Sequence, residues 1–470
     1  MKHLLSAFLF VAIISLTNAQ SIAPQGGGAL PALPHDEISQ EQYAAMRSDV
    51  QHNIEVLSAQ GKLVPAQQKT EALALEFPLA WNAGFSGYNF YGISNFADHN
   101  TAFPGALLDW NCGARTYDTD AGYNHQGIDY FLWPFSWKMM QEEQVQIVAA
   151  APGMIVARYD GNFDQNCAFN PGSWNAVFVR HDDGSTAWYG HMKNGSVTAK
   201  GLGDFVETGE YLGLVGSSGN STGPHLHFEL YDADGALMDP NSGACNEWND
   251  ESWWADQKPY IDPEINKLQT HFAPPTFPPC PEVEITNESN TFNVGDVCYF
   301  ALYAKDLSST DLCHLKITRA DGSVWYEWDF YQPADYFSAS YWYWFYTIPE
   351  DVPEGVWTWS AELAGKYYEH QFIVGDMPVD VHENGSYTSV NAYFQNNSLQ
   401  LQLSSSIEQQ SQIAIIDAMG RMVAEKSTIL QMGDNLITIP CETLSSGIYF
   451  IRILNSTTGA TTTIPVCKQF

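Results

Sequence analysis

Short runs of β-forming residues, separated by Gly, Asn and Asp, fill the chain from about Phe77 onwards. Strands this short bury a core only by pairing side by side, so the pattern predicts a mainly β protein built from antiparallel sheets. In the first such region we expect strands at residues 146–151, 176–180, 187–191, 211–215 and 225–231.

One short amphipathic helix is expected near the N-terminus. Apolar residues from Tyr43 to Leu57 recur at helical spacing. Ser39 stands where an N-cap belongs, and Gly61 is placed to end the helix. Residues 20–76 would therefore form a helical arm packed on the next domain, or a pro-segment.

Changes in composition along the 470-residue chain indicate further domain boundaries. The Pro-rich stretch at 273–282 predicts a stiff linker. We expect one β domain at 77–272, an Ig-like β-sandwich at 283–375 and, after a second junction, more alternating strands at 386–470. The net charge of -34 excludes nucleic acid as a partner, because no basic surface could be assembled.

The first nineteen residues indicate export. Lys2 and His3 precede an apolar run, and Thr17 to Ala19 form a small-residue cleavage site, which predicts a signal peptide at 1–19. The run is shorter than the roughly 20 residues needed to span a bilayer. Export makes disulfides the default for the eight cysteines, and short separations favour the pairs Cys298 with Cys313 and Cys441 with Cys467.

An unusual aromatic run occupies residues 341–346. As a strand it places Tyr341, Tyr343 and Phe345 on one face and Trp342, Trp344 and Tyr346 on the other. One interpretation is that one face fills the sandwich core while the other packs on a neighbouring segment. The alternative is a stacking platform for sugar rings.

The candidate metal-binding and catalytic residues are histidines and one aspartate. His225 and His227 alternate in a predicted strand and so share a face, where they could hold a metal, move protons or do neither. His125 and Asp129 would lie about 13 Å apart in a straight strand, too far to share an ion. Either they do not share one, or the backbone bends near Gly127. With one later histidine they would supply the three ligands of a catalytic zinc.

Five motifs together resemble the lysostaphin/LytM-type zinc metallopeptidases over about Tyr117 to Pro240. They are His125-Gln-Gly-Ile-Asp129, Ala150-Ala-Pro-Gly-Met-Ile-Val156, Tyr189-Gly-His191, Gly209-Glu-Tyr-Leu-Gly-Leu-Val-Gly-Ser-Ser-Gly219 and Gly223-Pro-His-Leu-His227.

The resemblance implies site residues. His125, Asp129 and His227 would bind one zinc ion, and His191 and His225 would be the catalytic residues beside the water and the scissile carbonyl. Gly and Ser residues at 216–223 would let a substrate backbone approach closely. Asn175 is a weaker candidate for holding that backbone.

The resemblance also implies an activity: a secreted zinc endopeptidase that hydrolyses peptide cross-links of bacterial peptidoglycan. Two alternatives stay open. One is a secreted zinc peptidase acting on Gly-rich proteins, and the other is a cell-wall-binding module without turnover.

The C-terminal region resembles the sorting domain of type IX secretion substrates. The resemblance rests on residues 413–423, residues 444–453, a Thr-rich strand and Lys468. It implies a second β-sandwich, passage through type IX machinery, and a location outside the cell or on the outer surface of a Gram-negative, Bacteroidetes-like bacterium. No segment after the signal peptide is predicted to span a membrane.

Overall fold

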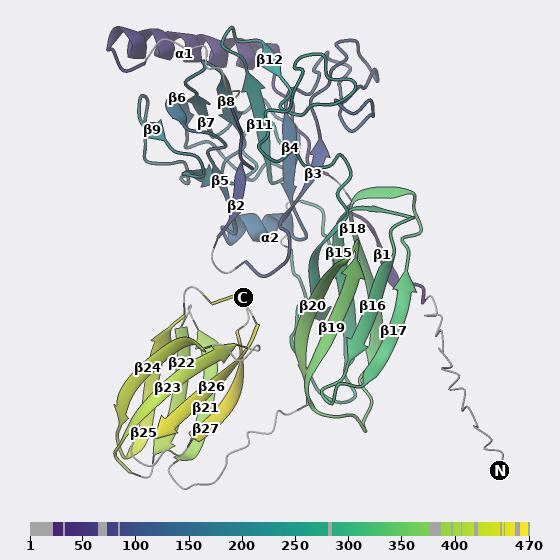
Figure 1. The fold of residues 1–470 in the computed structure, drawn as a ribbon, viewed down its shortest axis with the longest axis vertical. Helices are drawn as coiled ribbons and strands as arrows, with labels where there is room; N and C mark the ends of the chain where they lie inside the picture. The colour runs from purple at the N-terminus through teal and green to yellow at the C-terminus, as the bar shows by residue number, and fades with distance from the viewer. Residues whose placement is uncertain are drawn as a thin grey trace, which may run out of the picture.

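The computed structural model describes residues 22–31, 33–63, 73–82, 85–280, 284–375, 387–395, 398–405, 407–417, 422–441, 444–445, 447–455 and 461–468. The predicted signal peptide lies outside these ranges. Two helices and a series of β-sheets make up the described chain (Figure 1). This agrees with the mainly β prediction.

An eight-stranded antiparallel sheet carries the predicted site. Its order is β3-β4-β11-β8-β7-β6-β9, with β12 paired to β11. The bounds are β3 Tyr91–Asn95, β4 Ile128–Leu132, β11 His225–Tyr231, β8 Thr186–Tyr189, β7 Ala176–Arg180, β6 Gly153–Tyr159, β9 Phe205–Val206 and β12 Leu237–Met238. Strands β7 and β11 have the bounds that the sequence predicted. A smaller sheet joins β10 (Tyr211–Leu214), β5 (Val145–Val148) and β2 (Leu79–Trp81).

Strand β11 lies at the centre of this region, and all seven of its residues are buried. Leu226, Phe228 and Leu230 join the main apolar core. By alternation the opposite face of the strand presents His225, His227 and Glu229. These three polar side chains are 0 to 1% exposed, so their hydrogen-bonding groups must be satisfied by other protein groups or by a ligand.

Helix α1 (Gln40–Ala59) forms as predicted. Ser39 is the N-cap of a capping box with Gln42, and Gly61, at φ +67°, follows the C-terminal end. Tyr43, Val50 and Leu57 form its buried face against β6, where Asn53 Nδ2 donates to the Val156 carbonyl (2.8 Å). A second short helix, α2 (Ser136–Gln141), follows β4.

The next β-sandwich packs the sheet β1-β18-β15-β13 against the sheet β14-β20-β19-β16-β17. Bounds are β1 Gly26–Ala29, β13 Glu264–His271, β14 Thr291–Phe292, β15 Val297–Ser308, β16 Cys313–Thr318, β17 Val324–Phe330, β18 Tyr336–Thr347, β19 Gly355–Leu363 and β20 Lys366–Val374. Strand β13 pairs with β15, so this sandwich begins before the Pro-rich stretch that we predicted to precede it. Strand β1, from the N-terminal segment, pairs with β18 at the sheet edge.

The aromatic run lies in β18. Trp342 and Trp344 are buried in the sandwich core. On the other face Tyr341 and Tyr343 pack against a cluster that includes Trp133 and Phe277. The packing interpretation is therefore confirmed, because both faces contact protein.

The disulfide pairs differ from the predicted ones. Cys112 bonds Cys245 and Cys167 bonds Cys280. Cys298, Cys313 and Cys441 are free and buried. The two predicted pairs were therefore wrong: these thiols pack as small apolar groups, and proximity in sequence did not indicate pairing.

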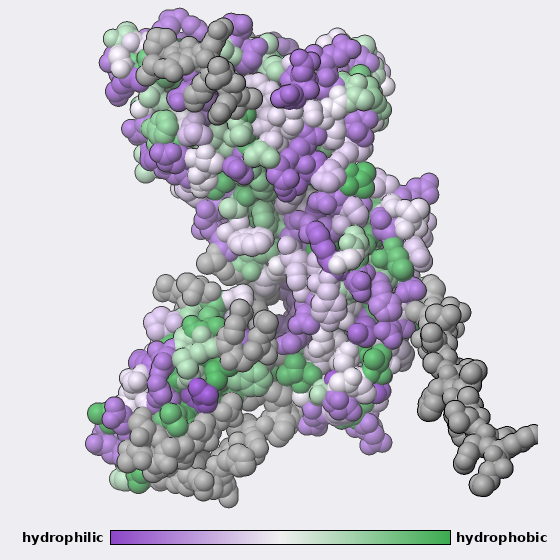
Figure 2. All heavy atoms as spheres, in the orientation of Figure 1, coloured by the Kyte–Doolittle hydropathy of each residue, from purple (hydrophilic) through white to green (hydrophobic). Residues whose placement is uncertain are grey.

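The C-terminal strands form two further sheets, β21-β22-β25 and β24-β23-β26-β27, around a separate apolar core. Bounds are β21 Tyr387–Gln395, β22 Ser398–Ser405, β23 Gln409–Asp417, β24 Met422–Leu430, β25 Gly433–Pro440, β26 Gly447–Asn455 and β27 Thr461–Lys468. Within the described ranges, neither helix is long and apolar enough to cross a membrane. Hydrophilic residues cover much of the face in Figure 2, in keeping with the large negative charge.

Candidate metal site

Three of the predicted ligands meet on neighbouring strands. The register of β4 and β11 sets His227 opposite Asp129, and His227 Nδ1 lies 2.9 Å from Asp129 Oδ1. His125 Nε2 lies 3.1 Å from the same oxygen and 3.2 Å from His227 Nδ1. The structure therefore brings His125, Asp129 and His227 together.

The chain bends between His125 and Asp129, which was one of the two alternatives left open by the sequence. Strand β4 begins only at Ile128, and the His125 N–H donates to the Tyr117 carbonyl. Gly127 matters here for its missing side chain. A Cβ at this position would lie 2.9 Å from the His227 ring and 2.6 Å from the Phe228 carbonyl oxygen.

Hydrogen bonds outside the cluster fix which ring nitrogens face inward. His125 Nδ1 lies 2.7 Å from the Phe96 carbonyl oxygen, and His227 Nε2 lies 2.7 Å from Glu229 Oε1. A carbonyl and a carboxylate only accept, so these outer nitrogens carry the hydrogens. In the neutral imidazoles the inner nitrogens, His125 Nε2 and His227 Nδ1, then present lone pairs to each other.

Asp36 completes the cluster, and no motif in the sequence indicated it. Its side chain is fully buried, and Asp36 Oδ2 lies 2.8 Å from His227 Nδ1 and 3.0 Å from His191 Nε2. Burial by itself would raise the pKa of Asp36, but the His227 and His191 imidazoles hold it well below its usual value. Asp36 is therefore a carboxylate within a buried group of imidazoles.

Four inward-facing atoms thus come from Asp36, His125, Asp129 and His227, all within 4.8 Å of one another. Two imidazole lone pairs and two carboxylates cannot satisfy one another by hydrogen bonds unless a proton or a cation lies among them. Burial would lower the pKa of His227, but the carboxylates around it raise that pKa well above its ordinary value. The pocket therefore favours positive charge, and this donor set suits a divalent metal ion.

The two predicted catalytic histidines lie beside this cluster. His225 Nδ1 is 2.8 Å from the Gly223 carbonyl oxygen, so this nitrogen carries the hydrogen. His225 Nε2 is buried with no hydrogen-bond partner, 3.6 Å from Asp129 Oδ1. Burial, with the neighbouring His191, lowers the pKa of His225 to about 4. Its imidazole is therefore neutral, with a free lone pair facing the candidate metal position.

His191 faces the same space from the turn after β8. Its Nδ1 lies 2.6 Å from the Ser218 carbonyl oxygen and its Nε2 lies 3.0 Å from Asp36 Oδ2. The rings of His191 and His225 are 4.5 Å apart between centroids. The structure therefore places all five predicted histidine and aspartate residues around one centre.

Glu229 is a further buried carboxylate that our sequence reasoning missed. Besides His227, it contacts Tyr231 and the hydroxyl of Tyr43, which donates to Glu229 Oε1 (2.6 Å). Glu229 follows His227 by two residues in β11, so strand alternation could have placed it on the same face. It orients the His227 ring so that Nδ1 faces the candidate metal.

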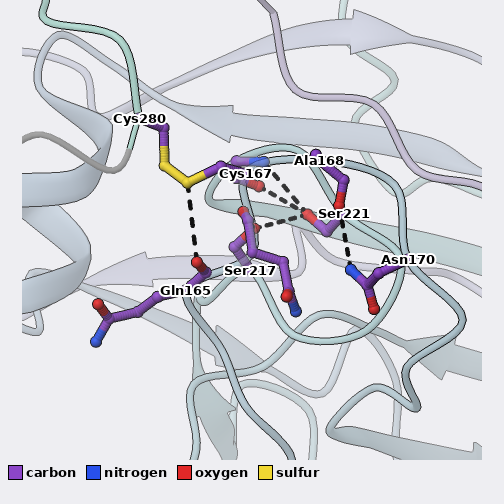
Figure 3. The surroundings of a disulfide bond; sticks show 9 residues. Gln165, Cys167, Ala168, Asn170, Ser217, Ser221 and Cys280 are labelled. Atoms are coloured by element: carbon purple, nitrogen blue, oxygen red, sulfur yellow. Dashed lines mark hydrogen bonds between the residues drawn. A yellow bond between two sulfur atoms is a disulfide. The ribbon is translucent and has the colours of Figure 1, made fainter.

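The loop 216–223 borders the site and is held rigidly. Ser217 Oγ donates to the Asn166 carbonyl and contacts Ser221 Oγ at 2.8 Å. The Cys167–Cys280 disulfide lies beside these serines (Figure 3). The Pro-rich linker, which contains Cys280, is therefore covalently joined to the loop that contains Cys167, next to the site.

Asn175 does not have the contacts expected for a substrate-holding residue. Its side-chain amide donates to the carbonyls of Met192 (3.1 Å) and Asn162 (2.9 Å) and accepts from the Asn162 N–H. It is fully buried, and these bonds occupy both ends of the amide. The observed contacts favour a different role, in which Asn175 positions the loop that carries His191.

Fold and site together define an antiparallel β protein with a buried histidine–aspartate cluster that is a candidate metal site. Residues 123–240, which contain all six of the predicted site residues, match the model of peptidase family M23, and residues 395–466 match the secretion system C-terminal sorting domain. The chain therefore contains an M23 peptidase domain and a C-terminal secretion sorting domain.

Individual relatives match the same region. DD-carboxypeptidase/endopeptidase Mpg of Neisseria meningitidis serogroup B is 47% identical over 105 residues, which are 22% of this chain and 19% of Mpg. Lysostaphin of Staphylococcus simulans is 30% identical over 109 residues, 23% of this chain and 18% of lysostaphin. The chain thus spans about a fifth of the length of these curated relatives.

Among solved structures, a mutant catalytic domain of the prophage-encoded M23 protein EnpA from Enterococcus faecalis is 27% identical. The alignment covers 32% of this chain and 88% of that domain, with a TM-score of 0.20.

Proposed function

We propose that the protein is an exported, zinc-dependent endopeptidase that hydrolyses peptide cross-links of bacterial peptidoglycan. The observation that carries the proposal is the convergence of His125, Asp129 and His227 on one point, with the unpartnered Nε2 of His225 facing it. Two imidazole nitrogens and a carboxylate are a ligand set that catalytic zinc uses.

Each histidine has a separate task in this proposal. Zinc held by His125, Asp129 and His227 would lower the pKa of a water molecule and polarise the scissile carbonyl. His225 takes the proton of the attacking water at Nε2, because its Nδ1 is committed to the Gly223 carbonyl. It then returns that proton to the leaving amine. His191 stabilises the developing oxyanion or orients His225.

The proposed substrate and location come from the relatives and the sorting domain. Mpg is named a DD-carboxypeptidase/endopeptidase, and ShyC of Vibrio cholerae, 30% identical over 99 residues, is named a peptidoglycan DD-endopeptidase. The sorting domain supports export through type IX machinery of a Bacteroidetes-like bacterium, to the medium or the outer surface.

Digestion of purified peptidoglycan tests the proposal. Because Asp36 lies among the site residues, the assay uses both the intact chain and Asp36→Ala, each with zinc, after chelation and after zinc is restored. We expect zinc-dependent release of fragments with new amino termini within the cross-link peptides, identified by mass spectrometry. If neither protein releases fragments while holding zinc, the proposed substrate is wrong. A parallel digest of a Gly-rich protein then tests the alternative.

A further inference from the structure

We propose that Arg115 is a positioning residue for two of the metal ligands and that Asp306, from the sandwich that follows, holds Arg115 in place. The sandwich is then part of the support of the metal site and not a separate module. The inference rests on the proposed function, because it concerns the affinity for the same zinc ion. Neither residue lies in the region 123–240 that matches the M23 model.

The end of strand β3 provides outer partners for two of the three proposed ligands. The Phe96 carbonyl oxygen accepts from His125 Nδ1 (2.7 Å). Next to it, Asn95 Nδ2 donates to Asp129 Oδ2 (3.1 Å). Outer partners of this kind fix the orientation of metal ligands. The position of residues 93–96 therefore sets the direction in which both ligands face.

Arg115 holds this segment at both of its ends. Its backbone carbonyl accepts from the Phe96 N–H (2.8 Å), and its guanidinium donates to the Ile93 carbonyl. The guanidinium also lies over the Phe96 ring, with 5.4 Å between Cζ and the ring centroid. The register of β3 against β4 shifts between Ile93 and Asn95, and bulges of this kind re-aim side chains next to active sites. Arg115 therefore fixes the irregular stretch that contacts the ligands.

Asp306, in β15, anchors the guanidinium from the sandwich. Asp306 Oδ1 lies 2.7 Å from an Arg115 Nη atom and also accepts from the Tyr336 hydroxyl (2.6 Å). The two charged side chains are only 5 to 7% exposed, so water and salt screen this ion pair little. The other Nη atom donates to the Tyr260 carbonyl (2.8 Å). The guanidinium thus joins β3, the segment before β13 and β15 at one point.

The backbone of Asp306 is unusual for a strand. Its φ is +51°, in the left-handed region that residues other than Gly rarely adopt. Consecutive strand residues normally face opposite sides, yet Lys305 Nζ and the Asp306 carboxylate both contact Asp262, at 2.7 Å and 3.3 Å. Such a costly conformation persists where the surrounding structure requires it. Here it allows two neighbouring charged residues to contact the segment just before β13.

The turn that carries Arg115 is braced by a separate set of bonds. The Asp109 carboxylate accepts from the N–H groups of Gly113 (2.8 Å) and Arg115 (2.9 Å). It also accepts from the Tyr260 hydroxyl (2.6 Å). Because these bonds do not involve the guanidinium, a change in the Arg115 side chain should affect residues 93–96 more than the turn itself.

Zinc affinity, measured by chelator competition with the full-length chain, tests the inference without any peptide substrate. Arg115→Lys keeps a positive charge beside Asp306, but a single ammonium cannot replace the planar fork that bonds three acceptors. Loss of an outer partner of a metal ligand costs about 10 to 100-fold in affinity, and Arg115 acts one contact further out. We therefore expect zinc affinity to fall about tenfold in Arg115→Lys. The visible spectrum of the cobalt(II) form should also change, because it reports the geometry of the ligands.

Asp306→Asn tests the contribution of the sandwich. Asparagine has a similar shape and tolerates the left-handed backbone, but it lacks the charge. We expect a smaller loss of zinc affinity than in Arg115→Lys. The double variant should lose no more than Arg115→Lys alone, because both residues act through the same contacts. Losses that multiply in the double variant would overturn the role of Asp306.

Glu288→Gln is the matched control for lost stability. It weakens another largely buried ion pair, in which Glu288 lies 2.7 Å from Lys267 and each side chain is 10% exposed. That pair lines a small cavity with Lys138 of α2, at a different contact between the sandwich and the site domain. We expect Glu288→Gln to bind zinc as tightly as the intact chain, even if urea unfolding shows that it is less stable.

Two results overturn the inference: unchanged zinc affinity in Arg115→Lys, or an equal fall in Glu288→Gln. Circular dichroism establishes that each metal-free variant is folded before titration. If Arg115→Lys does not fold, Asp306→Asn decides alone, and an affinity equal to that of the intact chain overturns the inference.

This inference and the proposed function can fail separately. If zinc affinity falls in Arg115→Lys but peptidoglycan is not digested by the intact chain or by Asp36→Ala, the positioning role is correct and the proposed substrate is wrong. If peptidoglycan is digested and Arg115→Lys binds zinc as tightly as the intact chain, the activity is correct and the positioning role is wrong.

Discussion

Every imidazole at the candidate metal site donates an outer N–H to a fixed acceptor. Backbone carbonyls serve His125, His191 and His225, and Glu229 serves His227. These bonds set the tautomers before any metal binds, so little reorganisation is needed when one does. His225 and His227, separated by one residue, can then have different tasks, because the free nitrogen is Nε2 in His225 and Nδ1 in His227.

His225 and His227 should therefore respond differently to truncation. We expect His225→Ala to hold about one zinc per chain yet lose hydrolysis, because it removes only the proton acceptor. His227→Ala should lose both zinc and hydrolysis. Metal content after dialysis and digestion of peptidoglycan, both in the Asp36→Ala background, measure this. Full turnover by the His225 variant would contradict its assigned role.

Glu229 should act on the metal through His227. Glu229→Gln keeps the size of the side chain but weakens the acceptor for His227 Nε2 (2.7 Å). Loss of such an outer partner typically costs about 10 to 100-fold in metal affinity. We expect a zinc affinity lowered by about this factor, measured by chelator competition. An unchanged affinity would show that Glu229 only fills space.

At the scale of elements, local sequence patterns correctly predicted those strands and the helix whose formation depends on residues close together in the sequence. Short runs of β-forming residues predicted the bounds of β7 and β11, and the cap and apolar stripe predicted α1. Strand alternation could also have placed Glu229 on the same face of β11 as His225 and His227. No periodic pattern encodes the β-bridge of Asp36 with Ser221 or the pairing of β13 with β15, because these depend on contacts between distant segments. The fourth ligand candidate and the start of the sandwich were missed for that reason.

Helix α2 provides a prediction about pH. Its N-cap residue, Phe135, provides no side-chain cap, and Glu284 Oε2 accepts from the Lys138 N–H instead (2.9 Å). Burial raises the pKa of Glu284 to about 7 from an ordinary value of 4.5. The folded chain thus binds a proton that the unfolded chain releases, so this group's contribution to stability falls as pH rises from about 4.5 to about 7.

Glu284→Gln should remove this dependence while keeping the acceptor. We expect the variant to be more stable than the parent by up to about 3 kcal/mol at pH 8, and the difference to shrink towards pH 5. Urea unfolding at several pH values measures it. A constant difference across this range would mean that Glu284 ionises normally in the folded chain.

At the scale of the whole molecule, the disulfides connect distant parts of the chain. Cys112–Cys245 spans 133 residues and Cys167–Cys280 spans 113. Separation in sequence misled the pairing prediction, because Cys298 and Cys313 lie in strands of different sheets, with their thiols inside the core.

The buried thiols should be unreactive until the protein unfolds. Cys298, Cys313 and Cys441 are 0 to 2% exposed, and burial raises the pKa of Cys313 to about 12. Iodoacetamide at pH 8 should leave all three unmodified in the native protein and label them in guanidinium. Peptide mapping by mass spectrometry locates the labels. A cross-linked Cys298–Cys313 peptide from unreduced protein would contradict the assignment.

Cys112 is the first cysteine in the sequence, so residues before it cannot be cross-linked to the rest through sulfur. Strand β1, Asp36 and α1 are consequently retained only by the backbone and by noncovalent packing. A single proteolytic cut after α1 would separate this part of the chain from the rest of the backbone. The fragment would then stay bound only by noncovalent contacts, and dilution would favour its dissociation. The strands that carry the site histidines and the linker would meanwhile remain one continuous polypeptide, further cross-linked by the two disulfides.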